Sequence, residues 1–245
     1  MLEYKRIISL VPSLTELLFD LGLKEELAGR TRFCVHPEND VKEIEIIGGT
    51  KNPNIEKILE LDPDFILANK EENRKEDIAE LSKFVQVKVT DIDTINEALI
   101  AIHELGEIFG RQTEAEKIIS ETTGYLDQTS EFQPLRTAYF IWKDPWMTVG
   151  NDTYIHDVLE SYRLKNIFSH EKRYPKTTLK EIAAKNPDLI LLSSEPYPFK
   201  EKHIKEIQEV CPSAKIELVN GEWFSWYGSR MPKAFSWLNN WRAAI

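Results

Sequence analysis

Two loops in the second half of the chain concentrate aromatic side chains that suit a large, flat, partly apolar ligand. In chain order the candidate contact residues of these loops are Trp142, Trp146, Trp223, Trp226, Tyr227 and Arg230. Aromatic rings bury apolar surface while keeping a polar edge, and an arginine fork pairs with a carboxylate or phosphate. Both loops follow predicted strands, where ligands bind in parallel sheets. We therefore expect a binding surface, the alternative being that the rings pack the protein's own core.

Two further loops are expected at the same edge, because each directly follows one copy of a repeated pattern. Asn69 and Lys70 follow the first copy and could bond polar groups of a ligand. Tyr197 follows the second copy, together with Phe199. The other interpretation is that the charged residues form a solvated loop.

His36 is the candidate metal ligand, since neutral imidazole is a common ligand of metals, including the metal of a bound chelate. A polar contact is the alternative role. His103, His156 and His203 lie on predicted helices and are interpreted as surface or internally satisfied histidines. The chain lacks the Walker, GxGxxG, HExxH and GxSxG patterns, so we expect a protein that is not an enzyme and has no intrinsic cofactor.

The elements that must position these loops follow from the repeated pattern, which covers residues 55–68 and 179–192. Each copy is an amphipathic helical stretch, a Pro-Asp stop and an apolar run. Proline cannot continue a helix, and an uninterrupted apolar run suits a buried parallel strand. The sequence therefore predicts an α/β protein of two lobes, each with a small parallel sheet flanked by helices, with the ligand in the crevice between them.

The stretch between the two copies changes to helical spacing over residues 95–129, with a predicted break at Gly110. We therefore expect an N-terminal α/β lobe over residues 1–93, connecting helices over 94–134, and a C-terminal α/β lobe over 135–245.

Composition narrows the partners. The formal net charge of −10 and the pI of about 5.2 argue against nucleic acid. No stretch is apolar enough to span a membrane. The N-terminal residues show neither a signal peptide nor a lipobox, so we expect a cytoplasmic protein as written, or a periplasmic one if an export signal is missing from this chain. We expect a monomer, with Cys34 and Cys211 as buried thiols.

Four segments carry a resemblance to a known family: residues 6–16, 34–37, 48–56 and 61–68. They look like cobalamin-binding proteins. These belong to the helical-backbone (class III) periplasmic-type solute-binding proteins of ABC importers, which carry cobalamin, haem or ferric siderophores. The resemblance covers nearly the whole chain and implies two α/β lobes joined by one long backbone helix.

The resemblance also implies roles for single residues. His36 corresponds to the family's tyrosine beside the corrin, and Trp223 to a tryptophan that contacts the ligand. Thr50 and Asn69 occupy places where the cobalamin-specific proteins have tryptophans.

Glu56 corresponds to one of two glutamates, one per lobe, that dock on the permease of the importer. The equivalent position in the second lobe is Lys180, which leaves its neighbour Glu181 as the docking candidate. The alternative for Glu181 is a capping box with Thr178.

The function that these patterns favour is non-enzymatic binding of a metal chelate, a corrinoid, haem or ferric siderophore, for an ABC permease. The alternatives are a cytoplasmic chelatase-like enzyme using His36 with Glu222 or Glu71, and a binder of a small molecule without metal.

Overall fold

The structure is a computed structural model that describes residues 4–245, and the chain divides into two compact units. Unit 1 comprises Met1–Ile92, Asn96–Glu121 and Tyr227–Met231. Unit 2 comprises Asp93–Ile95, Thr122–Trp226 and Pro232–Ile245. The first three residues of the predicted N-terminal lobe lie outside the described residues. The lobe limits expected from the sequence stay a prediction.

Unit 1 is built on a five-stranded parallel sheet in the order β3-β2-β1-β6-β7. Its elements are β1 (Ile7–Ser9), α1 (Pro12–Asp20), β2 (Leu27–Arg30), the 3-10 helix η1 (Asp40–Glu43), β3 (Glu45–Ile46), the hairpin β4 (Gly48–Gly49) and β5 (Asn52–Pro53), α2 (Ile55–Glu60), β6 (Phe65–Asn69), α3 (Lys75–Leu81), β7 (Gln86–Thr90) and α4 (Ile95–Phe109).

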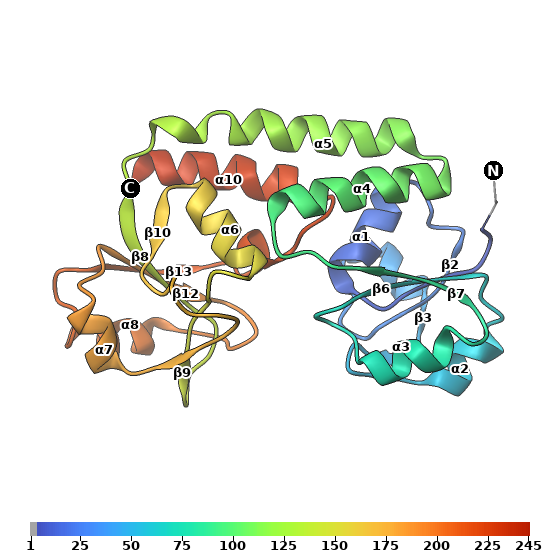
Figure 1. The fold of residues 1–245 in the computed structure, drawn as a ribbon, viewed down its shortest axis with the longest axis horizontal. Helices are drawn as coiled ribbons and strands as arrows, with labels where there is room; N and C mark the ends of the chain where they lie inside the picture. Colours follow the sequence, from blue (N-terminus) through green and yellow to red (C-terminus); the bar gives the residue numbers. More distant parts are fainter. Residues whose placement is uncertain (1–3) are drawn as a thin grey trace. The chain divides into compact units, whose positions relative to one another are not determined.

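Helices cover both faces of this sheet, with α1 and α4 on one side and α2 and α3 on the other (Figure 1). The central strands β1 and β6 are buried at every position, as their apolar sequences require. Ile8 and Ile66 face α2 and α3 in a core that includes Ile58 and Leu81. On the opposite face Phe65 packs edge-on against Phe109 of α4, with ring centroids 5.1 Å apart.

Unit 2 is built on a four-stranded parallel sheet in the order β10-β8-β12-β13. Its elements are the 3-10 helix η2 (Thr129–Glu131), β8 (Leu135–Phe140), β9 (Trp146–Met147), α6 (Tyr154–Ser161), β10 (Leu164–Asn166), β11 (Lys176–Thr177), α7 (Leu179–Ala184), β12 (Leu189–Ser193), α8 (Glu201–Gln208), β13 (Lys215–Val219), α9 (Glu222–Ser225) and α10 (Met231–Ala244).

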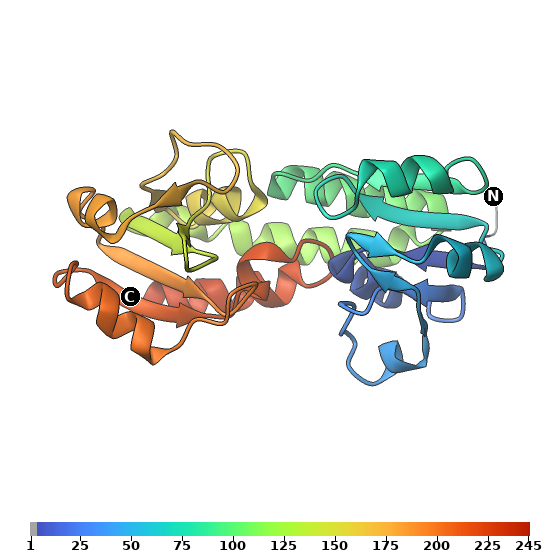
Figure 2. The ribbon, with the colours of Figure 1, turned by 90° about the horizontal axis from the view of Figure 1, so that it is seen from below.

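Figure 2 looks onto this sheet and shows β8, β12 and β13 side by side and pointing the same way. Alternate residues of the strands pack on opposite faces. Phe140 and Leu192 join the core under α7 and α8, with Ile182 and Ile207. Tyr139 faces the other way, its ring 5.1 Å from Phe224 of α9. The predicted α/β class with parallel sheets flanked by helices is confirmed.

Along the chain, the helical stretch between β7 and β8 contains α4 and a second helix, α5 (Gln112–Leu126). Gly110 separates them with φ of 67°, a left-handed conformation that ends α4 at the predicted break. The boundary between the units falls inside α5, between Glu121 and Thr122, so this helix continues without a break from one unit into the next. Among the described residues, no helix has the length and apolarity needed to cross a membrane.

Candidate functional site

Each sheet has one point where the strand order reverses, and that point locates the candidate site. In unit 1 the chain places β2 on one side of β1 and β6 on the other. In unit 2 it places β10 on one side of β8 and β12 on the other. Ligands of open α/β sheets bind outside the carboxyl ends of the strands at such points. The candidate binding loops are therefore those that follow β1 and β6 in unit 1 and those that follow β8 and β12 in unit 2.

The loops after β8 and β12 meet through Trp142 and Tyr197. Their ring centroids are 5.6 Å apart with an interplanar angle of 68°, an edge-to-face contact. Tyr197 continues into Phe199, 4.8 Å away. Trp142 keeps 40% of its surface exposed, whereas Phe199 is only 6% exposed. The sequence predicted both loops, and the structure brings them together with Trp142 as the accessible ring.

Trp146 does not share this exposure. Its side chain is 9% exposed, stacks on Phe199 and meets Phe140 edge-on, inside the core of unit 2. The cause is a pairing that local pattern does not reveal, because β9 is hydrogen-bonded antiparallel to β11, thirty residues further along the chain. In this structure Trp146 thus has the packing of the core alternative, and its contact with a ligand stays a prediction.

The aromatic loop that contains Trp223, Trp226 and Tyr227 is divided between the two units. Trp223 and Trp226 belong to unit 2, while Tyr227 belongs to unit 1 and is 8% exposed. Trp223 stacks on Trp237 of α10 at 6.4 Å. Trp226 donates its indole N–H to the carboxylate Oε1 of Glu195, 3.0 Å away. Both tryptophans are partly buried, so each presents only part of its ring to a ligand.

Asn69 organises the loop after β6. Its Nδ2 donates to the backbone oxygen and to Oγ1 of Thr90, at 3.2 and 3.1 Å. Its Oδ1 accepts the backbone N–H groups of Glu71 and Glu72. The side chain is 2% exposed and its amide makes four hydrogen bonds, so it braces this loop, and its predicted contact with a ligand stays a prediction.

The other predicted residues of unit 1 vary in exposure. Lys70 is exposed and forms an ion pair with Asp91 at 2.5 Å. Thr50 is 9% exposed, and its backbone oxygen accepts from Asn73. His36 is partly buried in the loop after β2. Its role as a ligand of a bound metal stays a prediction.

Arg230 has a partner within its own unit. Its Nε and Nη2 donate to the two carboxylate oxygens of Glu16 on α1, both at 2.7 Å. Arg230 is 6% exposed, and the Glu16 side chain 17%. This bidentate geometry is the one predicted for a ligand's carboxylate, but the carboxylate belongs to the chain. The guanidinium therefore joins the segment after α9 to α1, and its predicted contact with an anionic ligand stays a prediction.

The docking candidates differ. Glu56 lies exposed in the first turn of α2. Glu181 closes a capping box with Thr178, accepting from the backbone and hydroxyl of Thr178 and from the hydroxyl of Thr177. These hydrogen bonds lower the pKa of the Glu181 carboxyl, because they stabilise its charged form. The capping alternative is thus confirmed, and docking through Glu181 stays a prediction.

Two residues that the sequence reasoning passed over lie at the same strand ends. Glu195 follows β12 and accepts from both Ser225 and Trp226. Phe33 follows β2, with 53% of its surface exposed and the Arg32 guanidinium 5.9 Å from its ring centre. Position in the loop after a predicted strand was the available signal for Glu195.

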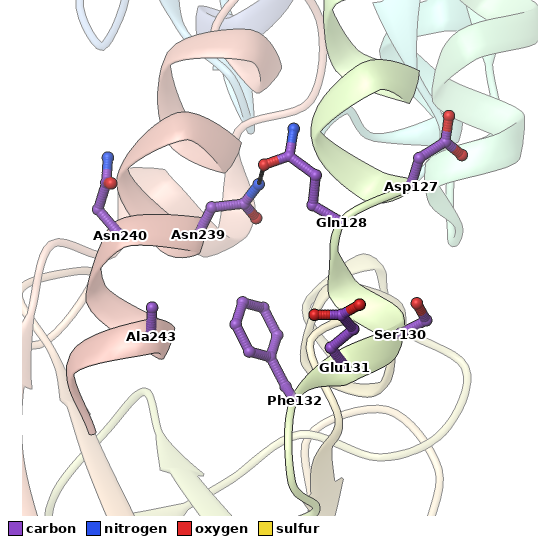
Figure 3. A pocket seen from close by; sticks show the side chains of 8 residues that line it. All are labelled: Asp127, Gln128, Ser130, Glu131, Phe132, Asn239, Asn240 and Ala243. Atoms are coloured by element: carbon purple, nitrogen blue, oxygen red, sulfur yellow. Dashed lines mark hydrogen bonds between the residues drawn. The ribbon is translucent and has the colours of Figure 1, made fainter.

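A pocket of unit 2 lies elsewhere, lined by eight residues from the end of α5, from η2 and from α10 (Figure 3). They are Asp127, Gln128, Ser130, Glu131, Phe132, Asn239, Asn240 and Ala243. Phe132 precedes β8, so the pocket lies at the amino end of that strand and contains none of the predicted site residues. Within residues 4–245 no cluster of three or more His, Cys, Asp or Glu side chains could hold a metal ion.

The family of the chain is defined by its sequence. Residues 7–211 match the family model described as periplasmic binding protein, which covers most of the chain. The chain therefore belongs to the periplasmic binding protein family, and it is a solute-binding protein. The resemblance found in the sequence is confirmed.

Two proteins with named roles are similar to the chain in sequence. The chain is 28% identical over 203 residues to an uncharacterised ABC transporter substrate-binding lipoprotein, YvrC, of Bacillus subtilis, spanning 77% of this chain and 63% of that protein. The matched part is thus less than two thirds of that relative's length. The chain is also 25% identical over 235 residues to the vitamin B12-binding protein of Pectobacterium carotovorum, and this match spans 93% of this chain and 84% of that protein.

A solved structure has the same fold. The periplasmic heme-binding protein RhuT of Roseiflexus sp. RS-1, in its apo form, superposes with a TM-score of 0.85 at 17% identity, covering 98% of both chains. At this identity the likeness concerns the fold alone.

Proposed function

We propose that this protein binds a metal chelate as cargo and delivers it to the permease of an ABC importer. The observation that carries the proposal is the exposed ring of Trp142, held edge-on by Tyr197 where the strand order of unit 2 reverses. A flat macrocycle or an iron chelate covers such a ring without needing any covalent chemistry. The relatives named for vitamin B12 and for an ABC transporter support the chelate and the permease.

The proposed role is binding and not catalysis, because the family consists of binding proteins. The chelate is then cargo and not a resident cofactor. Recovering the ligand after release, with unchanged absorption and mass, is the expected result. A ligand that returns with its metal inserted or removed would instead favour the chelatase-like alternative.

We also propose that the protein works outside the cytoplasm, because one relative is named a lipoprotein of an ABC transporter. Cell fractionation with an antibody against the native protein is the test. Recovery with the cytosolic fraction would refute this location without touching the binding proposal.

The experiment that tests binding is a visible-absorption titration of the purified protein with hydroxocobalamin, with haem and with a ferric siderophore. A saturable shift with one of the three is expected. Absence of a shift with all three would refute the metal-chelate proposal and favour a ligand without metal. Loss of an axial band in His36→Ala, with the remaining shift retained, would assign the metal contact to His36.

Trp142→Ala tests the position of the site. About 40% of this side chain is exposed, and covering roughly 80 Å² of a ring of about 200 Å² is worth about 2 kcal/mol, or about thirtyfold in Kd. The matched control is Phe84→Ala, because Phe84 is 63% exposed and lies two residues before the start of β7, at the amino ends of the strands of its sheet. Equal affinities of the two variants would exclude Trp142 from the site.

A further inference from the structure

His203 is a buried histidine next to the aromatic pair, and its hydrogen bonds define its tautomer. It lies in the first turn of α8 and is 2% exposed. Its Nδ1 accepts the backbone N–H of Lys200 at 2.9 Å. In the neutral ring the hydrogen is then on the other nitrogen, Nε2. That nitrogen lies 3.5 Å from the hydroxyl oxygen of Tyr197, toward which it can donate.

The ring of His203 also supports the neighbouring rings. Its centroid lies 5.6 Å from that of Tyr197 and 5.3 Å from that of Phe199, which it meets at 87°. Tyr197 in turn meets Trp142 edge-to-face. A single chain of contacts therefore runs from the helix N-terminus through His203 and Tyr197 to the exposed ring of Trp142.

We propose that His203 is a positioning residue of the binding site, which holds Tyr197 and through it Trp142 in the orientation that receives the ligand. This inference rests on the proposed function, because it assigns Trp142 to the ligand. A held ring loses less conformational entropy when a ligand immobilises it. Removing the support is expected to weaken binding without removing any atom that touches the ligand.

His203→Gln separates this role from helix capping. Glutamine at the third helical position can reach back to the N-cap N–H, so the cap of α8 is retained while the imidazole ring and its contact to Tyr197 are lost. We expect Kd for the chelate that binds the wild-type protein to rise about five- to tenfold. His156→Gln is the matched control, since His156 occupies the third position of α6 and contacts Asn166 instead. It should leave Kd unchanged.

Tyr197→Phe supplies the decisive comparison, because it removes only the hydroxyl. If His203 acts through Tyr197, the effects of the two substitutions on Kd are coupled, and the double variant binds no more weakly than His203→Gln alone. Additive effects, or a His203→Gln variant that binds like wild type, would overturn the inference.

Acid provides a second readout. Burial, with the nearby Lys143 and Lys202, lowers the pKa of His203, while Glu206 opposes the shift and Lys200 adds to it. Because its pKa is lowered, the ring is neutral at about pH 7.5, and protonation as the pH is lowered from there places a hydrogen on Nδ1, against the Lys200 N–H. Wild-type affinity should fall over that range more steeply than that of His203→Gln. Since His36 is present in both, their difference reports on His203; identical profiles contradict the proposal.

A measurement without ligand separates this inference from the proposed function. Near-ultraviolet circular dichroism of the free protein should change with acid in the wild type and much less in His203→Gln, because the aromatic cluster loosens only when His203 titrates. If no chelate binds the wild-type protein, the proposed function fails, and the comparison of circular dichroism spectra alone decides whether His203 positions the aromatic cluster. Spectra that respond equally to acid in both proteins would then refute the positioning role of His203.

Discussion

The ion pair between Arg230 and Glu16 yields a prediction that needs no ligand. Arg230→Met removes a 6%-exposed guanidinium that donates twice to Glu16, whose side chain is 17% exposed. Breaking a buried pair by removing one partner leaves an uncompensated charge and costs about 3–5 kcal/mol. For a chain of this size each kcal/mol lowers Tm by roughly 2–4 °C, so we expect a loss of roughly 6–20 °C. Thermal and urea unfolding followed by circular dichroism measure it.

A second variant distinguishes this pair from ordinary loss of packing. Glu16→Leu combined with Arg230→Met replaces both charges by apolar groups of similar volume, which is often neutral or stabilising. Most of the lost stability should therefore return. Asp91→Asn, which breaks the exposed pair with Lys70, serves as the control and should cost at most about 1 kcal/mol. If Arg230→Met costs no more than that control, or the double variant is no better than the single one, the buried pair does not contribute as argued.

Four other predictions concern bracing, capping and docking. Asn69→Ala removes the acceptor Oδ1 from the backbone N–H groups of Glu71 and Glu72 and one donor from each Thr90 oxygen, although the Thr90 backbone oxygen keeps the Lys70 N–H. Unfolding should therefore become easier by about 2–4 kcal/mol in a urea titration, and a loss below about 1 kcal/mol would contradict the bracing role. Thr178→Ala removes the cap of α7 and should cost about 1 kcal/mol. The pKa of Glu181 is lower in the folded protein, so its contribution to stability is present above its ordinary pKa and is lost as the pH falls through the lowered value. Glu181→Gln should therefore flatten the loss of stability at acid pH. An unchanged acid profile would exclude this contribution of Glu181. Glu56→Ala should leave Kd for the chelate intact while slowing uptake by the reconstituted importer, and a changed Kd would refute the docking assignment.

The elements were predictable where the signal is local. The Pro-Asp stops correctly separate α2 from β6 and α7 from β12, because proline excludes the helix and apolar residues fill the buried strand. Gly110 marks the end of α4 for an equally local reason, its positive φ. The loops after β8 and β12 followed from strand order, since parallel strands end at one edge.

The roles of single side chains were less predictable, because their partners are distant in sequence. Ser13 and Glu16 match a capping box, yet the N-cap of α1 is Val11 without a side-chain cap, and Glu16 instead pairs with a residue more than two hundred positions away. The bracing hydrogen bonds of Asn69 were hidden in the same way, because its two Thr90 acceptors belong to another strand. A local motif predicts a hydrogen-bond partner nearby in the sequence. A buried charge or amide, however, pairs with whichever group the fold brings within hydrogen-bond distance.

The two units share more than the repeated pattern revealed. In unit 1 the Asp64 carboxylate accepts the backbone N–H groups of Lys5 and Arg6, and the Arg6 side chain donates to the helix end at Leu61. In unit 2 Asp188 accepts from the backbone of Arg136, whose side chain donates to the oxygens of Lys185 and Asn186. In both units an arginine at the amino end of one central strand (Arg6 just before β1, Arg136 within β8) and the aspartate after the proline thus join the two central strands at their amino ends. Because this clamp repeats while the loops at the carboxyl ends differ, the clamp and the proposed binding loops occupy opposite edges of each sheet, and we expect the loops to tolerate changes of ligand without disturbing the strands that position them.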